Sequence, residues 1–456
     1  MAVHKYCGIE TEYGIVMRGV EESNPIAASS LLINAYLADL SEGVGSPTRV
    51  GWDFEDETPG NDARGTSPAG TLAPEVETHL VNAVLTNGAR YYVDHAHPEL
   101  STPECADARS VVVWDRAAEE ILARSMAAAA RILPPGQEIV IYKNNSDGKG
   151  NSYGCHENYL MDRSVPFHKV VTHATAHFVT RQLFTGSGKV GTEVAGLSSR
   201  DVPYQLTQRA DFFEAEVGLE TTLKRPIINT RDEPHADAQK YRRLHVIAGD
   251  ANMSEVATLL KVGTTALVLA MVEDDATPDD VVFLAPVQAM RQVSQDLTLR
   301  APLERTDGST IRALDVQWAY LEAARKYADR FGLDAVGTEV GADVLERWEA
   351  TLDDLELDPL RLADRIDWVA KLRLLDGYRE RHDAAWDDPR VAALALQYHD
   401  LRPDRSLAAR VGLQRVSSDD EVERAVSTPP PDTRAWFRGT CLKRWAPAIV
   451  AANWDS

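Results

Sequence analysis

The chain has 456 residues, 44% of them hydrophobic and 7% aromatic, so it is long enough for a large globular domain with a smaller one beside it. Its 48 Lys and Arg against 70 Asp and Glu give a formal net charge of -22, which argues against a general nucleic-acid-binding protein. The longest apolar stretch, residues 264–272, is too short to span a bilayer, and the start of the chain has no signal-peptide pattern. The four cysteines form no CxxC pair, so a cytoplasmic protein with free thiols and no membrane contact is expected.

The first predicted element is a strand, residues 7–16, in which two glutamates interrupt an apolar run. Side chains alternate along a strand, so Glu10 and Glu12 share one face and Ile9 points to the other. Two like charges on one face repel each other and are costly to bury unless a positive charge lies between them. The strand therefore either faces a cation or is half-exposed with solvated glutamates.

A helix is predicted for residues 29–40, and residues 45–74 follow it without any hydrophobic period. This stretch is rich in Pro and Gly and carries five acidic side chains. Structureless loops of such length are usually either functional or disordered. We predict a long mobile insertion, whose Trp52 and Phe54 either dock on another surface or are flexible filler.

The step Asn87-Gly88 lies between two alternating runs in residues 80–99 and predicts a β-hairpin. Alternate residues of the second strand present an acidic group on the same face as an arginine and a tyrosine. The polar side chains carried by this strand and the residues after it are Arg90, Tyr92, Asp94, His95, His97 and Glu99.

Helical patterns dominate the rest of the chain. The predicted helices cover residues 116–133, 170–183 and 253–272 and most of 313–399, and a strand is predicted for 138–145. The helix at 253–272 is apolar all round and is expected to be buried. Asp358-Pro359 suits a helix N-cap and first turn. The tail from residue 401 contains the stiff stretch TPPPDTRAW and is interpreted as a small second domain.

Acidic and histidine side chains from several of these elements would form one oxygen-rich site if the elements converge. Carboxylate-dominated sites suit Mg²⁺ or Mn²⁺ better than a structural zinc ion. The residues that such a site would combine are Glu10, Glu12, Asp94, Glu99, His156 and His245.

Residues 225–246 supply the other half of a phosphate site. Arginine has a planar fork that suits bidentate phosphate contacts, and arginines beside carboxylates and a hard cation indicate a nucleoside triphosphate. The arginines are Arg225, Arg231, Arg242 and Arg243. Each has a simpler interpretation on its own, because an isolated arginine is more often structural.

Six blocks of sequence, in order along most of the chain, resemble the family of Pup ligases and Pup deamidases/depupylases, in which Pup is the small prokaryotic ubiquitin-like modifier. The blocks are GIETEYG, TNGARYYVDHAHPE, YKNNSDGKGNSYGCHENYL, VTRQLFTGSGKVG, INTRDEPHADAQKYRRLHVIAGDANMSE and KVGTTALVL. The resemblance implies an α+β protein. Residues 1–400 would form a glutamine-synthetase-like catalytic domain with a curved antiparallel sheet, flanking helices and the insertion at 45–74. Residues 401–456 would form a small C-terminal domain, and family chains usually run some tens of residues further, so an incomplete C-terminus is one interpretation.

Three features resemble the deamidase branch more than the ligase branch. They are the insertion at 45–74, the block VDHAHPE where ligases resemble DVGSHPE, and EVGLETTLKR ahead of INTRDEPHAD. Cys155 departs toward the ligases, since deamidases carry Ser there. The Pup–protein ligase is therefore the first alternative. A catalytically silent Pup- or nucleotide-binding scaffold and a small-molecule amine ligase are two others.

The deamidase resemblance implies hydrolysis of a side-chain amide on the last residue of Pup. The enzyme would convert a C-terminal Gln to Glu and would also cleave the Pup–lysine isopeptide bond. Asp94 would be the catalytic carboxylate, attacking the amide carbon or activating a water. Its simpler interpretation is a strand-end carboxylate paired with Arg90.

The resemblance also implies cofactors and partners. Mg²⁺ would be bound, together with ATP that is not consumed stoichiometrically. The implied metal ligands are Glu10, Glu12, Glu99, His156 and His245. The implied nucleotide contacts are Arg225, Arg231, Arg243, Tyr92 and Trp454, although Trp454 also suits a core position. The expected partners are Pup and pupylated proteins, with a functional link to the bacterial proteasome, no nucleic acid and a monomeric enzyme.

Overall fold

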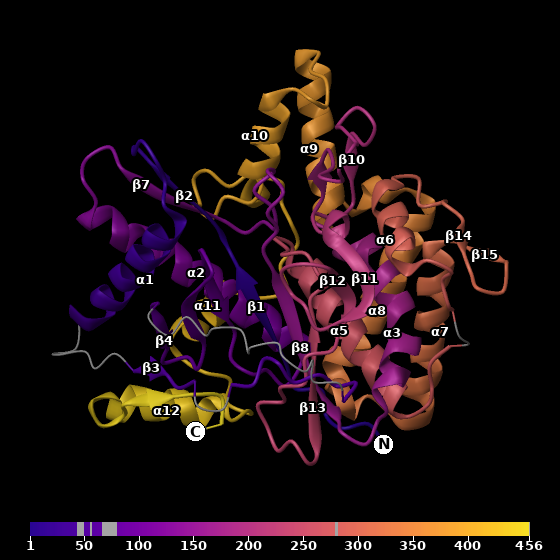
Figure 1. The fold of residues 1–456 in the computed structure, drawn as a ribbon, viewed down its shortest axis with the longest axis horizontal. Coiled ribbons are helices and arrows are strands. Elements are labelled where there is room, and N and C mark those ends of the chain that lie inside the picture. Colours follow the sequence, from indigo (N-terminus) through magenta and orange to yellow (C-terminus); the bar gives the residue numbers. More distant parts are fainter. Residues whose placement is uncertain (43–49, 55–56, 66–79, 279–280, 456) are drawn as a thin grey trace.

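An eight-stranded sheet carries the site-bearing part of the molecule, and the computed structural model describes residues 1–42, 50–54, 57–65, 80–278 and 281–455 (Figure 1). Neighbouring strands of this sheet are antiparallel except the last pair, which is parallel. In spatial order the strands are β13 (Tyr241–Val246), β8 (Cys155–Asp162), β1 (Cys7–Glu12), β6 (His97–Ser101), β5 (Arg90–Asp94), β4 (Asn82–Val84), β3 (Gly51–Trp52) and β16 (Ala451–Ala452). Helices cover the sheet, so the predicted α+β class is confirmed.

Shorter strands form four two-stranded sheets. Their members are β2 (Gly14–Arg18) with β7 (Glu138–Tyr142), β9 (Lys189–Val190) with β10 (Tyr204–Gln205), β11 (Phe213–Gly218) with β12 (Arg225–Asn229), and β14 (Leu303–Glu304) with β15 (Thr310–Ile311). The predicted strand 7–16 is thus divided at Tyr13, where the chain leaves β1 for the separate β2–β7 pair. Burial alternates along β1, and Glu10 and Glu12 lie together on its less buried face as predicted.

The predicted hairpin around Asn87-Gly88 is confirmed by the β4–β5 pair. Gly88 has a φ of +82°, in the left-handed region that an L residue with a side chain rarely adopts. The backbone N–H of Leu85 donates to the carbonyl of Ala89 at 2.8 Å and closes the turn. The next connection is equally tight, because Asp94 is paired with His97 and only two residues separate β5 from β6.

The helices lie in two groups on either side of the strands (Figure 1). One group contains α1 (Pro25–Glu42), α2 (Ala108–Ile132) and α11 (Asp419–Ser427), which pack together. The other contains α3 (Phe167–Thr180), α5 (Glu255–Glu273), α7 (Ala313–Phe331) and α8 (Thr338–Leu357). The remaining helices are α4 (Gln182–Thr185), α6 (Pro286–Gln295), α9 (Asp367–His382), α10 (Pro389–Gln397) and α12 (Ala435–Trp445).

Helix caps explain where the predicted boundaries shift. α2 begins at Ala108 rather than Arg116 because the Asp107 carboxylate accepts the N–H of Ser110 at 2.7 Å. The predicted helix 170–183 is divided into α3 and α4 at Arg181. Asp358 caps a short 3₁₀ turn, accepting the N–H of Leu360, and not an α-helix. α5 is buried as predicted, and although its length and apolar composition would suit a membrane span, it is entirely enclosed by the protein.

The prediction of a structureless insertion at 45–74 is wrong for Gly51–Trp52, which form β3. Two residues are too few to show a hydrophobic period, but the Trp52 side chain is buried and its ring contacts that of Trp454 at a centroid distance of 5.0 Å. Residues 45–49, 55–56 and 66–74 of the insertion lie outside the described residues, so its mobility stays a prediction.

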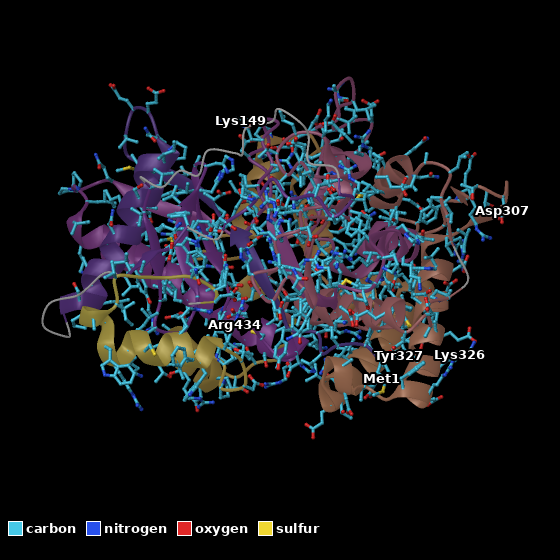
Figure 2. All side chains as sticks on the ribbon, turned by 60° about the horizontal axis from the view of Figure 1, so that its bottom comes forward. Met1, Lys149, Asp307, Lys326, Tyr327 and Arg434 are labelled. Carbon is cyan, nitrogen blue, oxygen red and sulfur yellow. The ribbon has the colours of Figure 1, made fainter. Side chains whose placement is uncertain are left out.

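The tail from residue 401 is attached to the rest of the chain at several points. Arg434, labelled in Figure 2, forms an ion pair with Glu104 at 2.7 Å, and Arg109 forms one with Glu421 at 2.9 Å. β16 extends the main sheet beside β3. The boundary at residue 400 stays a prediction.

Two buried lysines differ in their surroundings. The Lys143 ammonium contacts Asp115 and Glu119, each at 2.7 Å, and these carboxylates outweigh burial and raise its pKa above the usual value. The Lys371 ammonium, on α9, instead donates to the carbonyl of Gly188 at 2.8 Å and contacts His399 Nε2. Burial lowers the pKa of Lys371 to about 7.

Replacing Lys371 with Met should therefore change how stability depends on pH. Above pH 7 the unfolded chain holds a proton on Lys371 that the folded protein has released, so wild-type stability rises with pH through this group up to about pH 10. We expect the free energy of unfolding of Lys371→Met, relative to that of wild type, to be highest at pH 6.5 and to decrease progressively toward pH 9. Urea unfolding of both proteins at several pH values measures this difference.

Lys143→Met is the matched control for that experiment. Its pKa is raised, so the ion pairs persist throughout pH 6.5 to 9 and the variant should be destabilised by about 3–5 kcal/mol at every pH. Parallel stability profiles for Lys371→Met and wild type would contradict the interpretation of Lys371.

Candidate active site

A cavity of about 830 Å³ opens over five adjacent strands, β13, β8, β1, β6 and β5. Strand alternation brings the polar side chains of all five strands to the same face of the sheet. Register then fixes the neighbours: Glu10 lies opposite His156, and Glu12 lies opposite Glu99. Of the predicted site residues, those that line this cavity are Glu10, Tyr92, Asp94, Glu99, His156, Arg231, Arg243, His245 and Trp454.

The first group in the cavity contains one carboxylate and two imidazoles. Ligand atoms of Glu10, His156 and His245 all lie within 4.8 Å of one another. Nδ1 of His156 is 3.3 Å from Glu10 Oε1, and Nδ1 of His245 is 3.5 Å from the same oxygen. Burial and the charge of Arg243 lower the pKa of His245 well below its usual value, so its imidazole is neutral at pH 7, the form that binds metals.

The charge state of Glu10 differs from what burial alone would give. Burial favours the protonated carboxyl, but the hydrogen bond and charge of His156, with the charge of Arg243, hold the pKa of Glu10 below its usual value. Glu10 is therefore an ionised oxygen ligand at neutral pH. One ionised carboxylate and two imidazole side chains form half of a coordination shell that suits a divalent cation.

The second group consists of three carboxylates. Ligand atoms of Glu12, Asp94 and Glu99 also lie within 4.8 Å of one another. Burial and the charge of Asp94 raise the pKa of Glu12, and burial with the same charge raises the pKa of Glu99 well above its usual value. Within the described part of the chain, no Lys or Arg forms an ion pair with any of the three. The group thus carries more negative charge than its surroundings neutralise, which a hard cation would relieve.

Asp94 differs from its two neighbours in access and charge. Its side chain is 38% exposed, whereas Glu99 is buried. Burial would raise the pKa of Asp94, but the hydrogen bond from His95 lowers it below the usual value. The environment therefore leaves one reachable, ionised carboxylate beside two that favour protonation, a separation typical of sites that use carboxyl groups in different roles.

The loop between β7 and β8 closes one side of the carboxylate group. The backbone N–H of Gly154 donates to Glu12 Oε1 at 2.9 Å, and the Tyr153 ring contacts His97 at a centroid distance of 4.4 Å. A Cβ on Gly154 would lie 2.2 Å from Nε2 of His156, so only glycine allows this approach. The sequence alone did not identify this wall of the site.

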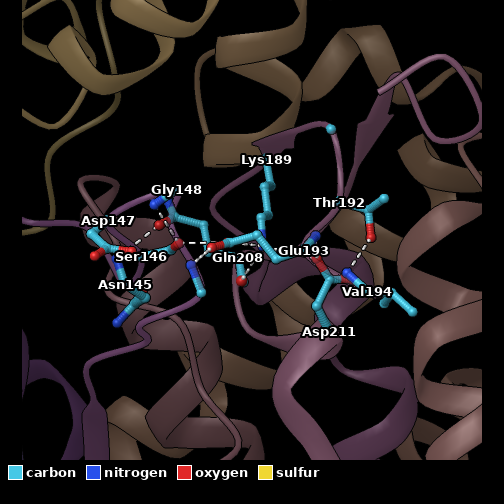
Figure 3. Close-up of polar contacts among 12 residues, drawn as sticks. Asn145, Ser146, Asp147, Gly148, Lys189, Thr192, Glu193, Val194, Gln208 and Asp211 are labelled. Carbon is cyan, nitrogen blue, oxygen red and sulfur yellow. Dashed lines mark hydrogen bonds and ion pairs between the residues drawn. The ribbon is translucent and has the colours of Figure 1, made fainter. Parts of the chain in front are cut away.

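Glu193 anchors the same loop from the other side (Figure 3). Its carboxylate accepts the Ser146 hydroxyl at 2.6 Å and the backbone N–H of Gly150 at 2.7 Å. Lys189 pairs with Glu193 and also with Asp211, the latter at 2.8 Å. The tip of the loop, with Lys149 labelled in Figure 2, remains exposed to solvent. The loop is thus tied down on both sides of an exposed, glycine-containing tip.

Arginines and aromatic rings form the wall of the cavity away from Asp94. Arg243 donates to the carbonyl of Glu233 at 2.7 Å and lies beside Asn158, a cavity residue that shares its strand face with His156 and was not predicted. Trp454 lines the cavity while packing on Trp52, so both interpretations of this residue hold in part.

Arg90 is not the partner of Asp94. Its guanidinium lies 4.1 Å from the ring centroids of both Trp52 and Tyr92, and it pairs with Glu57 at 3.2 Å. Asp94 is instead bonded to His95. The simpler interpretation of Asp94, a strand-end carboxylate paired with Arg90, is thus not what the contacts describe.

Arg242, one of the four arginines predicted for a phosphate site, does not line the cavity, and its Nη1 donates to the carbonyl of Val165 at 2.8 Å. Arg225, predicted as a nucleotide contact, does not line the cavity either. Its Nη2 donates to the carbonyl of Ser152 at 2.9 Å and its Nε to that of Thr221 at 2.8 Å. Spacing along β12 could not reveal this, because the direction of the side chain depends on the β11–β12 pair that holds the strand.

Comparison with known proteins places these residues in context. The family model described as Pup-ligase protein matches residues 5–456. The chain is 52% identical over 466 residues to the depupylase of Acidothermus cellulolyticus, covering 100% of this chain and 90% of the relative. It is 46% identical to the Pup deamidase/depupylase of Mycolicibacterium smegmatis, covering 100% and 91%. It is 45% identical over 371 residues to the Pup–protein ligase of Kineococcus radiotolerans, covering 79% and 80%.

Solved structures give the same grouping. The fold is similar to the complex of Pup with its ligase PafA, with a TM-score of 0.77 and 31% identity, covering 96% of this chain and 82% of that one. It is also similar to the ligase PafA in complex with ADP, with a TM-score of 0.72 and 37% identity, covering 79% and 80%. The glutamine-synthetase-like fold that the sequence resemblance implied is thereby confirmed.

Replacing Glu99 with Gln tests the charge of the carboxylate group. The raised pKa of Glu99 means that the folded protein keeps a proton that the unfolded chain loses, so this group lowers wild-type stability as pH rises. Without added cations, we expect the free energy of unfolding of Glu99→Gln to lie within about 1 kcal/mol of the wild-type value near pH 6. Toward pH 8 it should increase relative to wild type. Chemical unfolding in the presence of a chelator measures both values.

Glu157→Gln is the matched control, because Glu157 is buried and bonded through both oxygens to Arg181. Removing that charge should cost about 3–5 kcal/mol at either pH. An equally large loss for Glu99→Gln would contradict the interpretation that Glu99 lacks a cationic partner.

Proposed function

Since the chain belongs to the family of Pup-ligase proteins, we propose that it is a Pup deamidase and depupylase. It hydrolyses the side-chain amide of a C-terminal Gln on Pup to give Glu, and it cleaves the isopeptide bond between Pup and a lysine of a modified protein. The observation that carries this proposal is the similarity, over the whole chain, to relatives named for these two activities. The reachable Asp94 beside two cation-binding groups supplies the chemistry.

The ligase remains the second candidate. Identity alone separates the branches weakly, because a ligase shares 45% and a deamidase 46%. Coverage separates them better, since the depupylases match the full chain and the ligase only 79% of it. Acyl transfer to a lysine needs consumption of ATP, whereas amide hydrolysis does not, so nucleotide turnover distinguishes the two.

Asp94 is proposed to perform the hydrolysis. Its carboxylate either attacks the amide carbon, to form an acid anhydride that water then opens, or removes a proton from the attacking water. In both cases the C–N bond breaks, and the nitrogen leaves as ammonia or as the lysine amine. The lowered pKa of Asp94 keeps it ionised for either role at neutral pH.

The two ligand groups are proposed to hold Mg²⁺. Glu10, His156 and His245 would form one set, and Glu12 with Glu99 the other. The un-neutralised negative charge of the second set and the neutral imidazole of His245 in the first support this fit. Bound Mg²⁺ would place positive charge where the amide oxygen becomes negative.

A nucleotide is proposed to occupy the wall of the cavity away from Asp94. Arg231 and Arg243 would contact the phosphates, while Tyr92 and Trp454 would flank the rest of the molecule. The ligase PafA binds ADP, which supports ATP or its product as the ligand here. Arg225 is left out of this set because its guanidinium donates to the backbone carbonyls of Ser152 and Thr221 and does not line the cavity.

Pup and pupylated proteins are the proposed partners of a monomeric, cytoplasmic enzyme that is linked functionally to the proteasome. A complex of Pup with the ligase PafA supports Pup as a ligand of this fold. With a net charge of -22, the chain has no general electrostatic attraction for nucleic acid.

Asp94→Asn should abolish both reactions. We expect at least about 10³-fold lower rates, because amide removes the charge needed for attack or proton removal while keeping the shape. Intact-mass spectrometry of Gln-ended Pup, incubated with Mg²⁺ and ATP, follows the amide-to-acid conversion. Asp404→Asn, at an exposed carboxylate on the tail, is the control and should match wild type. Retained conversion in Asp94→Asn would refute its role. ATP consumption on adding Glu-ended Pup and a target protein would indicate the ligase.

Mg²⁺ binding should release protons and weaken as pH falls. Glu12 and Glu99 have raised pKa values, so a cation must displace protons that these groups hold more firmly than free carboxyl groups do. Calorimetric titration in two buffers with different ionisation enthalpies measures the number released. For each proton displaced, we expect the affinity for Mg²⁺ to fall by up to about tenfold for every pH unit below 7. A pH-independent affinity would contradict binding at this group.

A further inference from the structure

The turn between β5 and β6 holds a histidine in an unfavourable backbone conformation. Asp94 is paired with His97, so His95 and Ala96 alone make the turn. His95 has a φ of +50°, in the left-handed region, at the first position of a two-residue hairpin. Glycine takes this conformation without strain, and asparagine tolerates it better than most residues. A side chain kept at such a position is a reason to ask what the side chain does.

The side chain of His95 contacts the reactive carboxylate. Its Nδ1 lies 2.9 Å from Asp94 Oδ2, and both residues line the large cavity. The His95 side chain is 65% exposed, so a substrate that reaches Asp94 also reaches this imidazole. The turn thus presents an acid–base pair at the mouth of the site, with the imidazole on the solvent side.

We propose that His95 is a catalytic residue that donates a proton to the departing nitrogen. This inference rests on the proposed amide hydrolysis. As the bond between the amide carbon and nitrogen breaks, the electron pair goes to nitrogen, which takes a proton from the imidazolium of His95 and leaves as ammonia or as the lysine amine. Water then opens the acyl intermediate and supplies the oxygen of the product carboxylate. One proton of this water returns to His95 and restores the imidazolium, the other passes to the released amine or to solvent, and Asp94 leaves as the free carboxylate.

The other imidazoles of the cavity are less suited to this step. His156 and His245 face Glu10 in the first ligand group. His97 is largely buried, and burial lowers its pKa to about 4, so it is neutral at pH 7. The charged and titratable groups around the turn are Asp94 and Arg90 on β5, His97 on β6, His156 on β8 and Asp147 on the β7–β8 loop.

Two substitutions separate proton donation from turn geometry. His95→Asn keeps a residue that accepts positive φ and can still donate an amide N–H to Asp94, but it cannot transfer a proton. His95→Gly removes the side chain and relieves the backbone. Asp383→Gly is the matched control, because Asp383 has a φ of +47° at the C-terminus of α9 and does not line the cavity.

We expect kcat for deamidation to fall about 10²-fold or more in both His95 variants, while the control keeps wild-type activity. His95→Gly and Asp383→Gly should each have a higher Tm than wild type, which shows that lost activity is not lost folding. Added imidazole should raise the deamidation rate of His95→Gly by at least about tenfold. The decline of kcat at alkaline pH in wild type should be missing in His95→Asn.

The measurements distinguish failure of this inference from failure of the proposed function. If wild type converts Gln-ended Pup but both His95 variants stay within about threefold of it, His95 is not the proton donor. Loss of activity without imidazole rescue and with an unchanged alkaline limb would also overturn the inference, leaving a role in turn geometry. If wild type itself does not convert the amide, the proposed function fails first.

Discussion

The candidate active site depends on the repulsion between carboxylates that three adjacent strands bring together. β1 lies in the middle of the five strands beneath the cavity, and its alternation places Glu10 and Glu12 on the same side. Neighbouring strands add Glu99 and Asp94, and among the described residues no Lys or Arg forms an ion pair with either of them or with Glu12. Folding therefore concentrates negative charge on a sheet that would be more stable with apolar side chains there. The surrounding fold must tolerate that cost until a cation is bound.

The same constraint gives chemically similar groups different properties. Burial and mutual repulsion push Glu12 and Glu99 toward protonation, whereas His95 keeps Asp94 ionised at the exposed end. Position along the strands, and not residue type, thus decides which carboxylate is reactive. This is the arrangement by which one sheet supports both ligand binding and bond cleavage.

Local pattern predicted much of this site, and long-range pairing decided the rest. Alternation in β1 and the Asn87-Gly88 turn were enough to place Glu10, Glu12 and Asp94 on the cavity face. The direction of Arg225 and the anchoring by Glu193 depend on segments distant in sequence, whose pairing no local period reveals. β3 escaped detection because two residues carry no period. His95 was visible in the sequence, but its strained backbone was not.

The parallel pairing of β3 with β16 has a consequence for the biogenesis of the enzyme. These strands lie far apart in the sequence, and they bring Trp52 against Trp454, which lines one wall of the cavity. During synthesis, Trp52 emerges from the ribosome long before its partner exists. The wall that Trp454 completes can therefore form only after translation has passed that residue. A nascent chain therefore carries the acidic residues of the site long before it can complete the cavity, and any activity that needs the whole cavity waits for Trp454.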